Sequence, residues 1–464
     1  MVQIERHSRW MFIILPALAM MLGWGLRGHI GGGTGGAMIP GAMVALTLSL
    51  LLKLPAAATS IIVVFGIFGI GMGGQMTYGQ TLGFLMNPET VWWGNIGTTL
   101  KGAIWGLMGG AILSLGFVYK QLSEKTIIVA LLLMMTGMLI GFKLINDPMI
   151  IYFSDPENPR RESWAGLLSG AVVLLSYFKF KTSSSDFKII FRFALLGMIG
   201  GGLGFGLGGY WMVLNSYIPL IGSYIDLWKA MEFTFGLLLG AFLGYAGWLS
   251  RKELKICINK DWAGSEMLFR SAYKEFGAIL LVLILGYWLI PYLLRLFAGA
   301  VMGYDGFIFD ALQNIARIMG NFAFRGGLVF VLVIMLFPKI AWQLGITLTF
   351  YPAAINLMRT FYPEVNSISF FTIHGLFAFL LSIVIVILVA YFSRKEKTVL
   401  NMFLLLTWSC IAVSLAKLTN LADWYFIDGL SAYQMFLRKY LIDIFFVVSG
   451  IIVTWIAVRQ AQTV

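Results

Sequence analysis

Apolar stretches of about 17 to 25 residues recur along the chain, separated by short charged or Pro/Asn-rich breaks. Such a stretch is long enough for a helix to cross the hydrocarbon core of a bilayer. The pattern therefore predicts an all-α polytopic integral membrane protein with about fourteen transmembrane helices. The predicted spans are 10–27, 37–52, 56–74, 96–118, 126–145, 164–178, 189–209, 229–249, 276–297, 325–342, 343–358, 369–392, 398–417 and 438–458. Span 343–358 is short and contains Pro352, so a re-entrant or interfacial segment is the alternative there.

Composition supports this class. Of the 464 residues, 59% are apolar and 12% are charged, whereas a soluble domain carries roughly 25% charged residues. A soluble fold of this length would lack the polar surface to cover itself. We expect the chain to lie in a bacterial plasma (inner) membrane, with membrane lipids as partners.

The charges predict an orientation. With the N-terminus in the cytoplasm, the inner loops and helix ends hold 20 of the 33 basic residues and 8 of the 21 acidic residues. The inner side then carries +12 and the outer side zero, as the positive-inside rule requires. We predict that both termini are inside (N-in/C-in). The alternative for the N-terminus is a signal peptide that is cleaved near Ala17-Leu18-Ala19. Topology and anionic inner-leaflet lipids explain the basic charge, so we expect no nucleic-acid partner.

The first half contains a short repeated motif, Gly-Leu-x-x-Gly-Ala. It occurs at 106–111, 166–171 and 236–241, with a looser copy at 37–42, and each copy lies in an even-numbered predicted span. We interpret residues 1–250 as eight transmembrane helices in four tandem two-helix hairpins, which form a parallel rather than an inverted repeat. Small residues four positions apart also allow close helix packing in lipid.

In the first half, four predicted helices run from the inner to the outer side. Three of them end in glycine-dense segments, at 23–36, 66–83 and 197–209. Glycine costs a helix roughly 1 kcal/mol relative to alanine, so we predict breaks there. Non-helical backbone at membrane depth must be buried in protein or line a water-filled cavity. The breaks predict one shared outer cavity, and packing alone is the alternative. A nucleotide-binding loop is excluded because the preceding strand and the Lys-Ser/Thr pair are missing. Binding of an anion at the start of a half-helix is a remaining alternative.

Residues 251–275 separate the two halves. They mix Lys and Arg with apolar residues and predict a cytoplasmic amphipathic linker that lies on the inner membrane surface. Residues 276–464 form the second half, with about six transmembrane helices.

The candidate substrate-binding residues lie at the predicted outer helix ends and loops. Glu232 lies about three residues inside its span, and an intramembrane carboxylate is a functional candidate with a basic partner. Arg27, Arg160 and Arg161 are the candidate partners, and Lys229 shares its helix face. The full set is Arg27, His29, Trp93, Arg161, Glu162, Trp164, Asp226, Trp228, Glu232, Arg317 and Arg325. An interfacial aromatic belt and salt-bridged helix ends are the structural alternatives.

These residues favour a secondary transporter for a small polar or anionic solute, such as a saccharide, with Arg27, Glu162 and Glu232 in one outward-facing polar chamber. The alternative is an intramembrane transferase that acts on a lipid-linked or acylated substrate at the extracytoplasmic face, with His374 or an outer carboxylate as its base. A structural subunit of a larger complex is a third interpretation. The sequence has no ATP-binding module, zinc motif, serine elbow or haem-type histidine pair, so we predict neither a metal nor a cofactor. A homo-oligomer is compatible with the sequence.

Overall fold

The computed structural model describes residues 8–155, 157–160, 162–262, 271–282, 328–362, 373–420 and 431–462, with single residues between 269 and 300. Within these ranges the chain forms helices and turns and no strand. The helices are α1 (Arg9–Ile30), α2 (Gly33–Leu52), α3 (Ala56–Gly73), α4 (Gly79–Leu85), α5 (Val91–Phe117), α6 (Glu124–Gly141), α7 (Trp164–Lys181), α8 (Ser184–Tyr217), α9 (Pro219–Tyr224), α10 (Leu227–Leu249), α11 (Arg251–Asp261), α12 (Ala272–Val282), α15 (Leu328–Leu336), α16 (Ala341–Phe361), α17 (Ile373–Phe392), α18 (Thr398–Lys417) and α19 (Ala432–Gln462).

In the described ranges, ten helices are long and apolar enough to cross a bilayer. They are α1, α2, α3, α5, α6 with its π-helical extension to Asn146, α8, α10, α17, α18 and α19. The predicted class, an all-α membrane protein, is confirmed. The count of about fourteen spans and the kind of membrane stay predictions. At the weakest predicted span, 343–358, α16 runs as one helix through Pro352.

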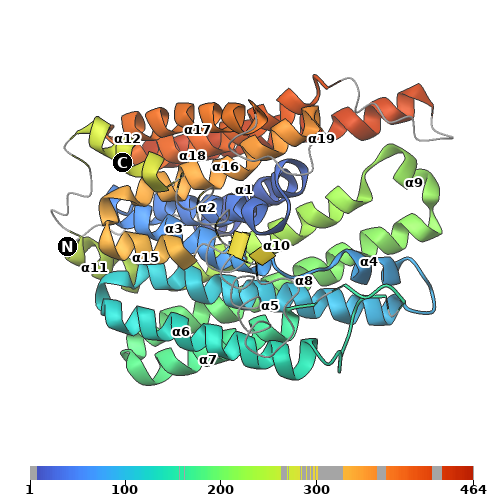
Figure 1. The fold of residues 1–464 in the computed structure, drawn as a ribbon, viewed down its shortest axis with the longest axis horizontal. Helices are drawn as coiled ribbons and strands as arrows, with labels where there is room; N and C mark the ends of the chain where they lie inside the picture. The colour runs from blue at the N-terminus through green and yellow to red at the C-terminus, as the bar shows by residue number, and fades with distance from the viewer. Residues whose placement is uncertain are drawn as a thin grey trace.

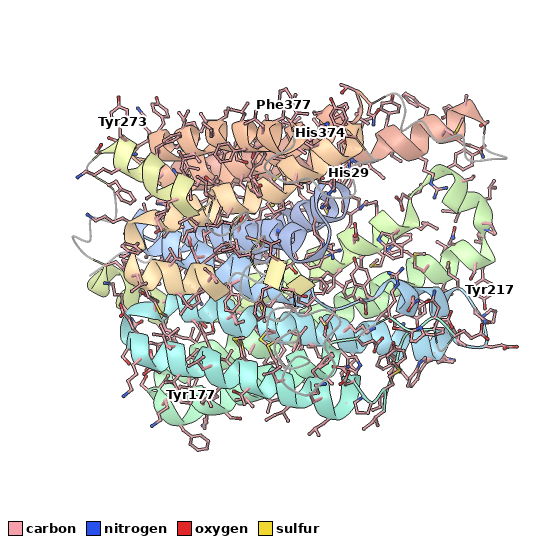
Figure 2. The ribbon with its side chains drawn as sticks, in the orientation of Figure 1. His29, Tyr177, Tyr217, Tyr273, His374 and Phe377 are labelled. Carbon is pink, nitrogen blue, oxygen red and sulfur yellow. The ribbon has the colours of Figure 1, made fainter. Side chains whose placement is uncertain are left out.

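Helices α1 to α3 lie between α5–α8 on one side and α16–α19 on the other (Figure 1). In the most apolar stretches of α2 and α3, 89% of the residues are buried, against 33% in α17. The first two therefore form the centre of the bundle, and α17 is on its surface. Phe377 of α17, half exposed, projects from this flank (Figure 2).

The two ends of the bundle carry different loops. The C-terminal end of α19 lies with α11 and α12 at one end, and α4 and α9 lie at the opposite end (Figure 1). Exposed tyrosines mark both ends, Tyr217 beside α9 and Tyr273 at the start of α12 (Figure 2). Segments predicted inside and outside thus gather at opposite ends. Which end faces the cytoplasm stays a prediction.

The four predicted hairpins correspond to neighbouring helices. Helix α1 packs on α2, α3 on α5, α6 on α7, and α8 on α10. Three further contacts, α5 with α8, α1 with α10 and α2 with α3, are comparably extensive and join one pair to another. Neighbouring pairs are compatible with a tandem repeat, which stays a prediction.

The predicted break at 197–209 is wrong. Helix α8 runs unbroken from Ser184 to Tyr217, through all the glycines of that segment. The reason is close packing against α5. A Cβ added to Gly106 would lie 1.8 Å from the carbonyl oxygen of Gly197, and one on Gly102 would lie 2.2 Å from that of Gly201. Backbone contact of this kind needs glycine, and it offsets the low helix propensity of the segment.

The packing interpretation of the repeated motif holds for α10 as well. A Cβ on Gly236, Gly240 or Gly244 would lie 2.5, 2.4 or 1.9 Å from a backbone oxygen of α1. The small residues four apart therefore let α10 contact the α1 backbone directly. This close approach brings the first turns of α10 against the last turns of α1, where the candidate site lies.

Gly106→Ala should lower the apparent melting temperature of the purified protein. The new methyl group overlaps the Gly197 carbonyl, so α5 and α8 must separate, at a cost of about 1–3 kcal/mol. Tryptophan fluorescence during heating in detergent measures the shift. The matched control is Gly83→Ala, because no atom lies within 4 Å of a Cβ at Gly83. Equal melting of the two variants would contradict backbone contact at Gly106.

The other two glycine segments break only briefly. Residues 23–30 and 33–36 are helical, and α1 separates from α2 at Gly31 and Gly32, with φ +71° at Gly32 and +55° at Gly33. Between α3 and α4, residues 74–78 are non-helical. The extended break predicted at 23–36 is therefore reduced to one turn. The short breaks place Arg27 and Tyr78 at helix ends.

Part of the predicted linker is helical. Residues Arg251–Asp261 form helix α11. Leu254, Ile258 and Trp262, spaced four apart, are 0, 1 and 4% exposed. Trp262 stacks on Tyr119, and the Lys120 ammonium lies 4.8 Å from the Trp262 ring centroid. The protein itself covers these three side chains, and the position of the linker on the inner membrane surface stays a prediction.

Candidate functional site: two buried charge clusters

Arg27, in the last turn of α1, is held by aromatic rings. Its guanidinium carbon lies 5.5 Å from the ring centroids of Trp24 and Trp105 and 5.4 Å from that of Tyr78. Only 5% of the residue is exposed. Nη1 donates to the Tyr78 hydroxyl and, at 3.4 Å, to Oε1 of Glu232. Nε is buried without a hydrogen-bond partner. The guanidinium therefore keeps donor capacity that the protein leaves unused.

Two residues of α10 complete this cluster. Asp226 caps the helix by accepting the backbone N–H of Lys229 at 3.2 Å, which fixes the first turn. Lys229 Nζ then donates to Oε2 of Glu232 at 2.6 Å, three residues further along the same face. Glu232 is 1% exposed. We call Arg27, Lys229 and Glu232 the α1–α10 cluster; with two cations and one anion its net charge is +1.

Gly28 is the residue that lets α1 approach this carboxylate. A Cβ at position 28 would lie 2.1 and 2.3 Å from the two Glu232 oxygens and 2.4 Å from Lys229 Nζ. A side chain at position 28 would therefore displace the Glu232 carboxylate and the Lys229 ammonium from their present positions. Gly28, first noted as part of a break, thus leaves the space that the charged groups of this cluster occupy.

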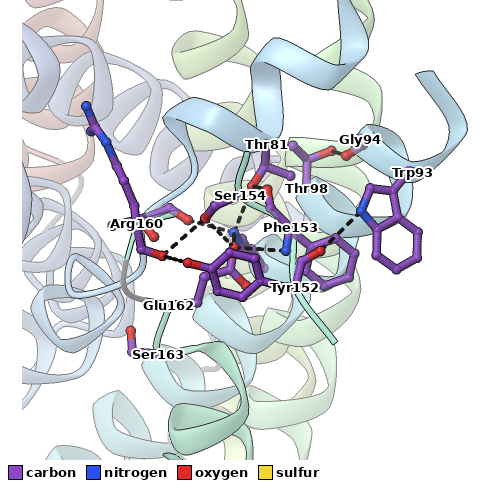
Figure 3. A network of polar contacts seen from close by, with 12 residues as sticks. Thr81, Trp93, Gly94, Thr98, Tyr152, Phe153, Ser154, Arg160, Glu162 and Ser163 are labelled. Atoms are coloured by element: carbon purple, nitrogen blue, oxygen red, sulfur yellow. Dashed lines mark hydrogen bonds and ion pairs between the residues drawn. The ribbon is translucent and has the colours of Figure 1, made fainter. Parts of the chain in front are cut away.

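A second cluster lies on α5 and the segment before α7. Lys101 Nζ donates to Glu162 Oε1 at 2.8 Å, to the Thr77 carbonyl at 2.7 Å and to the Thr81 hydroxyl at 2.8 Å. The same Glu162 oxygen accepts the Ser154 hydroxyl at 3.0 Å, part of the network in Figure 3. Lys101 and Glu162 are each 1% exposed. This α5–α7 cluster has one charge of each sign and is neutral.

Residues 77–81 connect the two clusters. The Thr77 carbonyl and the Thr81 hydroxyl accept from Lys101, and the Tyr78 hydroxyl between them accepts from Arg27. The Trp228 ring stacks on Tyr78 with centroids 6.0 Å apart. Any movement of this segment therefore changes the contacts of both clusters.

The structure brings some predicted site residues together and separates others. Glu232 pairs with Arg27, one of the three partners predicted for Glu232, and Trp228 lies on Tyr78 beside them. Glu162 pairs instead with Lys101, which the sequence analysis did not single out. The three residues predicted to line one chamber thus belong to two clusters. Asp226 acts as a helix cap.

The remaining aromatic candidates have structural contacts. Trp93 is 41% exposed and donates its indole N–H to the Tyr152 carbonyl at 3.2 Å. Trp164, the first residue of α7, is buried edge-on against Phe153. Arg161, Arg317 and Arg325 lie outside the described residues.

His374, the second residue of α17, lies beside Tyr362. The two ring centroids are 3.8 Å apart, and Nδ1 of the imidazole is buried without a partner. In the described part of the chain, no hydrogen bond or ion pair joins His374 to a carboxylate.

A further polar group joins the two halves of the chain. Asp443 of α19 accepts the Ser414 hydroxyl at 2.5 Å, and its Oδ1 lies 4.0 Å from Nε2 of His29. Lys417 of α18 donates to the His29 carbonyl at 2.7 Å and to the Asn356 side-chain oxygen at 3.2 Å. His29, a predicted site residue, thus fixes the end of α1 against α16, α18 and α19.

Comparison of the chain with known families, with curated proteins and with solved structures finds no match. Its site must be interpreted from its own geometry.

Proposed function

We propose that the protein is a secondary transporter for a small solute with a carboxylate or phosphate group, and that Arg27 binds that group. The observation that carries the proposal is the α1–α10 cluster, which is buried at one end of two membrane-type helices with a net charge of +1. A buried unbalanced cation is costly unless an anion joins it. A solute anion would complete the charge balance.

Arg27 has the chemistry for this task. A guanidinium presents five N–H donors in a planar fork that matches carboxylate and phosphate groups, and here only Nη1 has a described partner. The Trp24, Tyr78 and Trp105 rings surround the cation, and of these three residues only Tyr78 takes one of its donors. They also leave little exposed, so the state described is closed to water.

Glu232 supplies a competing internal anion. It lies 2.6 Å from Lys229 but 3.4 Å from Arg27, so the arginine is its weaker partner. A solute anion that displaces Glu232 from Arg27 would leave the carboxylate paired with Lys229. The exchange loosens the contact between α1 and α10 and gives two arrangements of one site. A solute that binds one of them more tightly shifts the population, as alternating access requires.

Arg27→Lys should abolish most of the response to an anionic solute. The test is the apparent melting temperature of the full chain in detergent with glucuronate, acetate, inorganic phosphate or neutral glucose, since a ligand that binds the folded state stabilises it. At least one anion should raise it and glucose should not. The lysine keeps the charge but loses the bidentate fork, which should weaken binding about tenfold. Arg160→Lys is the matched control, because Arg160 is exposed.

Two results would overturn the proposal. One is a panel in which no anion stabilises the protein. The other is a stabilising anion whose effect on Arg27→Lys equals that on the parent chain. Uptake of the selected anion into proteoliposomes then separates a transporter from a protein that only binds it.

A further inference from the structure

Trp24 lies beside Arg27 and carries a hydrogen-bond donor that the protein does not use. It precedes Arg27 by three residues in α1, so the two side chains are neighbours on one helix face. The Trp24 side chain is fully buried, and among the described residues its indole Nε1 has no hydrogen-bond partner. A buried donor without an acceptor is costly. The function proposed above uses the Trp24 ring and leaves this donor unexplained.

Arg27 has a second donor of this kind. Its Nε is buried and makes no hydrogen bond within the part of the chain that the structure describes. The guanidinium carbon lies 5.5 Å from the centroid of the Trp24 ring. The other indole beside Arg27 differs, because Trp105 donates its N–H to the Ile70 carbonyl at 2.7 Å. The two donors without an acceptor therefore belong to adjoining side chains, Trp24 and Arg27.

The space beside Arg27 already holds a carboxylate. The two Glu232 oxygens lie where a side chain of residue 28 would begin, 2.1 and 2.3 Å from an added Cβ. One of them is 3.4 Å from Nη1 of Arg27. Gly28 thus leaves room for a carboxylate against α1. When Glu232 withdraws towards Lys229, as in the proposed exchange, a solute carboxylate can take the same space.

Charge selects among the anions that Arg27 could bind. The α1–α10 cluster of Arg27, Lys229 and Glu232 has a net charge of +1, so a solute with a single carboxylate brings it to zero. Inorganic phosphate or a phosphate monoester carries about −1.5 to −2 charges at neutral pH. Such a group would leave the buried cluster negative, which is costly. The charge balance therefore favours a carboxylate.

We propose that the solute is a monocarboxylate whose two oxygens accept hydrogen bonds from Nε of Arg27 and from Nε1 of Trp24. This inference rests on the proposed function and narrows its substrate class from carboxylates and phosphates to monocarboxylates. A carboxylate presents two oxygens to the two donors and satisfies both at once. Trp24 is thereby a residue that determines specificity.

The test compares how much acetate or glucuronate is needed for a given rise in the apparent melting temperature of the full chain. This concentration is proportional to the dissociation constant. Trp24→Phe keeps an aromatic ring and removes the N–H, so the concentration should increase about tenfold, as expected for the loss of a hydrogen bond to a charged group. Inorganic phosphate at pH 8, where it is a dianion, should not stabilise the parent chain. Trp164→Phe is the matched control, because Trp164 is also buried with an unbonded Nε1 among the described residues but begins α7.

Two outcomes would overturn this inference and leave the proposed function intact. In the first, a carboxylate stabilises Trp24→Phe as well as the parent chain but has lost most of its effect on Arg27→Lys. In the second, phosphate at pH 8 stabilises the parent chain as strongly as acetate or glucuronate does. If no anion stabilises the parent chain, the proposed function is overturned together with this inference.

A second measurement decides if Trp24→Phe gives no folded protein. In the parent chain labelled with 15N-tryptophan, one indole N–H signal should move downfield when acetate is added, because that N–H then donates to a carboxylate. The signal that is absent from Trp164→Phe should stay in place. A spectrum in which no indole signal moves, at an acetate concentration that stabilises the protein, would overturn the role of Trp24.

Discussion

Replacement of Lys101 by methionine should remove most of the folded protein from a detergent extract. Lys101 is 1% exposed, and Glu162 is its ion-pair partner at 2.8 Å. Methionine fills a similar space but leaves a buried carboxylate without a cation, which costs about 3–5 kcal/mol. The change also removes the donor to Thr77 and Thr81, so residues 77–81 lose two hydrogen bonds to α5. The monodisperse fraction on size exclusion and the apparent melting temperature measure the loss.

The double variant Lys101→Met/Glu162→Gln identifies the cause. This double variant removes both charges and leaves no unpaired carboxylate. It should therefore be more stable than Lys101→Met alone, even though it carries two substitutions and not one. Lys143→Met is the exposed counterpart. Its ion pair with Asp147 is 2.6 Å long but has side chains 59% and 42% exposed, and should contribute about 1 kcal/mol or less. If the double variant is no more stable than the single one, the unpaired carboxylate is not what destabilises Lys101→Met.

The sequence predicts the helices well because a membrane span is a local property. An apolar run about 20 residues long is sufficient evidence by itself. The predicted limits 37–52, 56–74 and 398–417 differ from α2, α3 and α18 by at most four residues. Local helix propensity gives the wrong prediction for a segment whose conformation is determined by packing against a helix far away in the sequence. Nothing near residues 197–209 shows that the α5 glycines will contact them and keep α8 helical.

In the charge clusters, the individual residues could be predicted from the sequence, but their pairing could not. Intramembrane depth identified Glu232, and the same rule applied to the predicted spans 96–118 and 438–458 would have found Lys101 and Asp443, each five residues inside. Pairing was harder. Arg27 was one of several candidate partners for Glu232, and the choice depends on glycines that let α1 and α10 touch. The ion pair between Glu162 and Lys101 depends on how the segment before α7 folds over α5. No local sequence pattern predicts that arrangement.

Replacement of Glu232 by glutamine should abolish the anion response and also lower stability. Glutamine keeps the size of the side chain but removes the only negative charge of the α1–α10 cluster, so two buried cations face each other. It also removes the internal competitor that a solute must displace from Arg27. We expect a loss of at least about tenfold in the affinity for the stabilising anion, together with a lower apparent melting temperature without ligand.

Two further variants separate the two effects. Glu89→Gln is the matched control, because Glu89 is an exposed carboxylate near α4 and should change neither measurement. Lys229→Met/Glu232→Gln restores the cluster charge to +1, so its stability should recover. If Glu232 serves only to balance charge, the anion response will recover with stability, and the exchange mechanism is wrong. If stability recovers while the concentration dependence and the uptake rate stay impaired, the carboxylate acts in the exchange itself. A folded Glu232→Gln protein with the parent's anion affinity and uptake rate would exclude any such role.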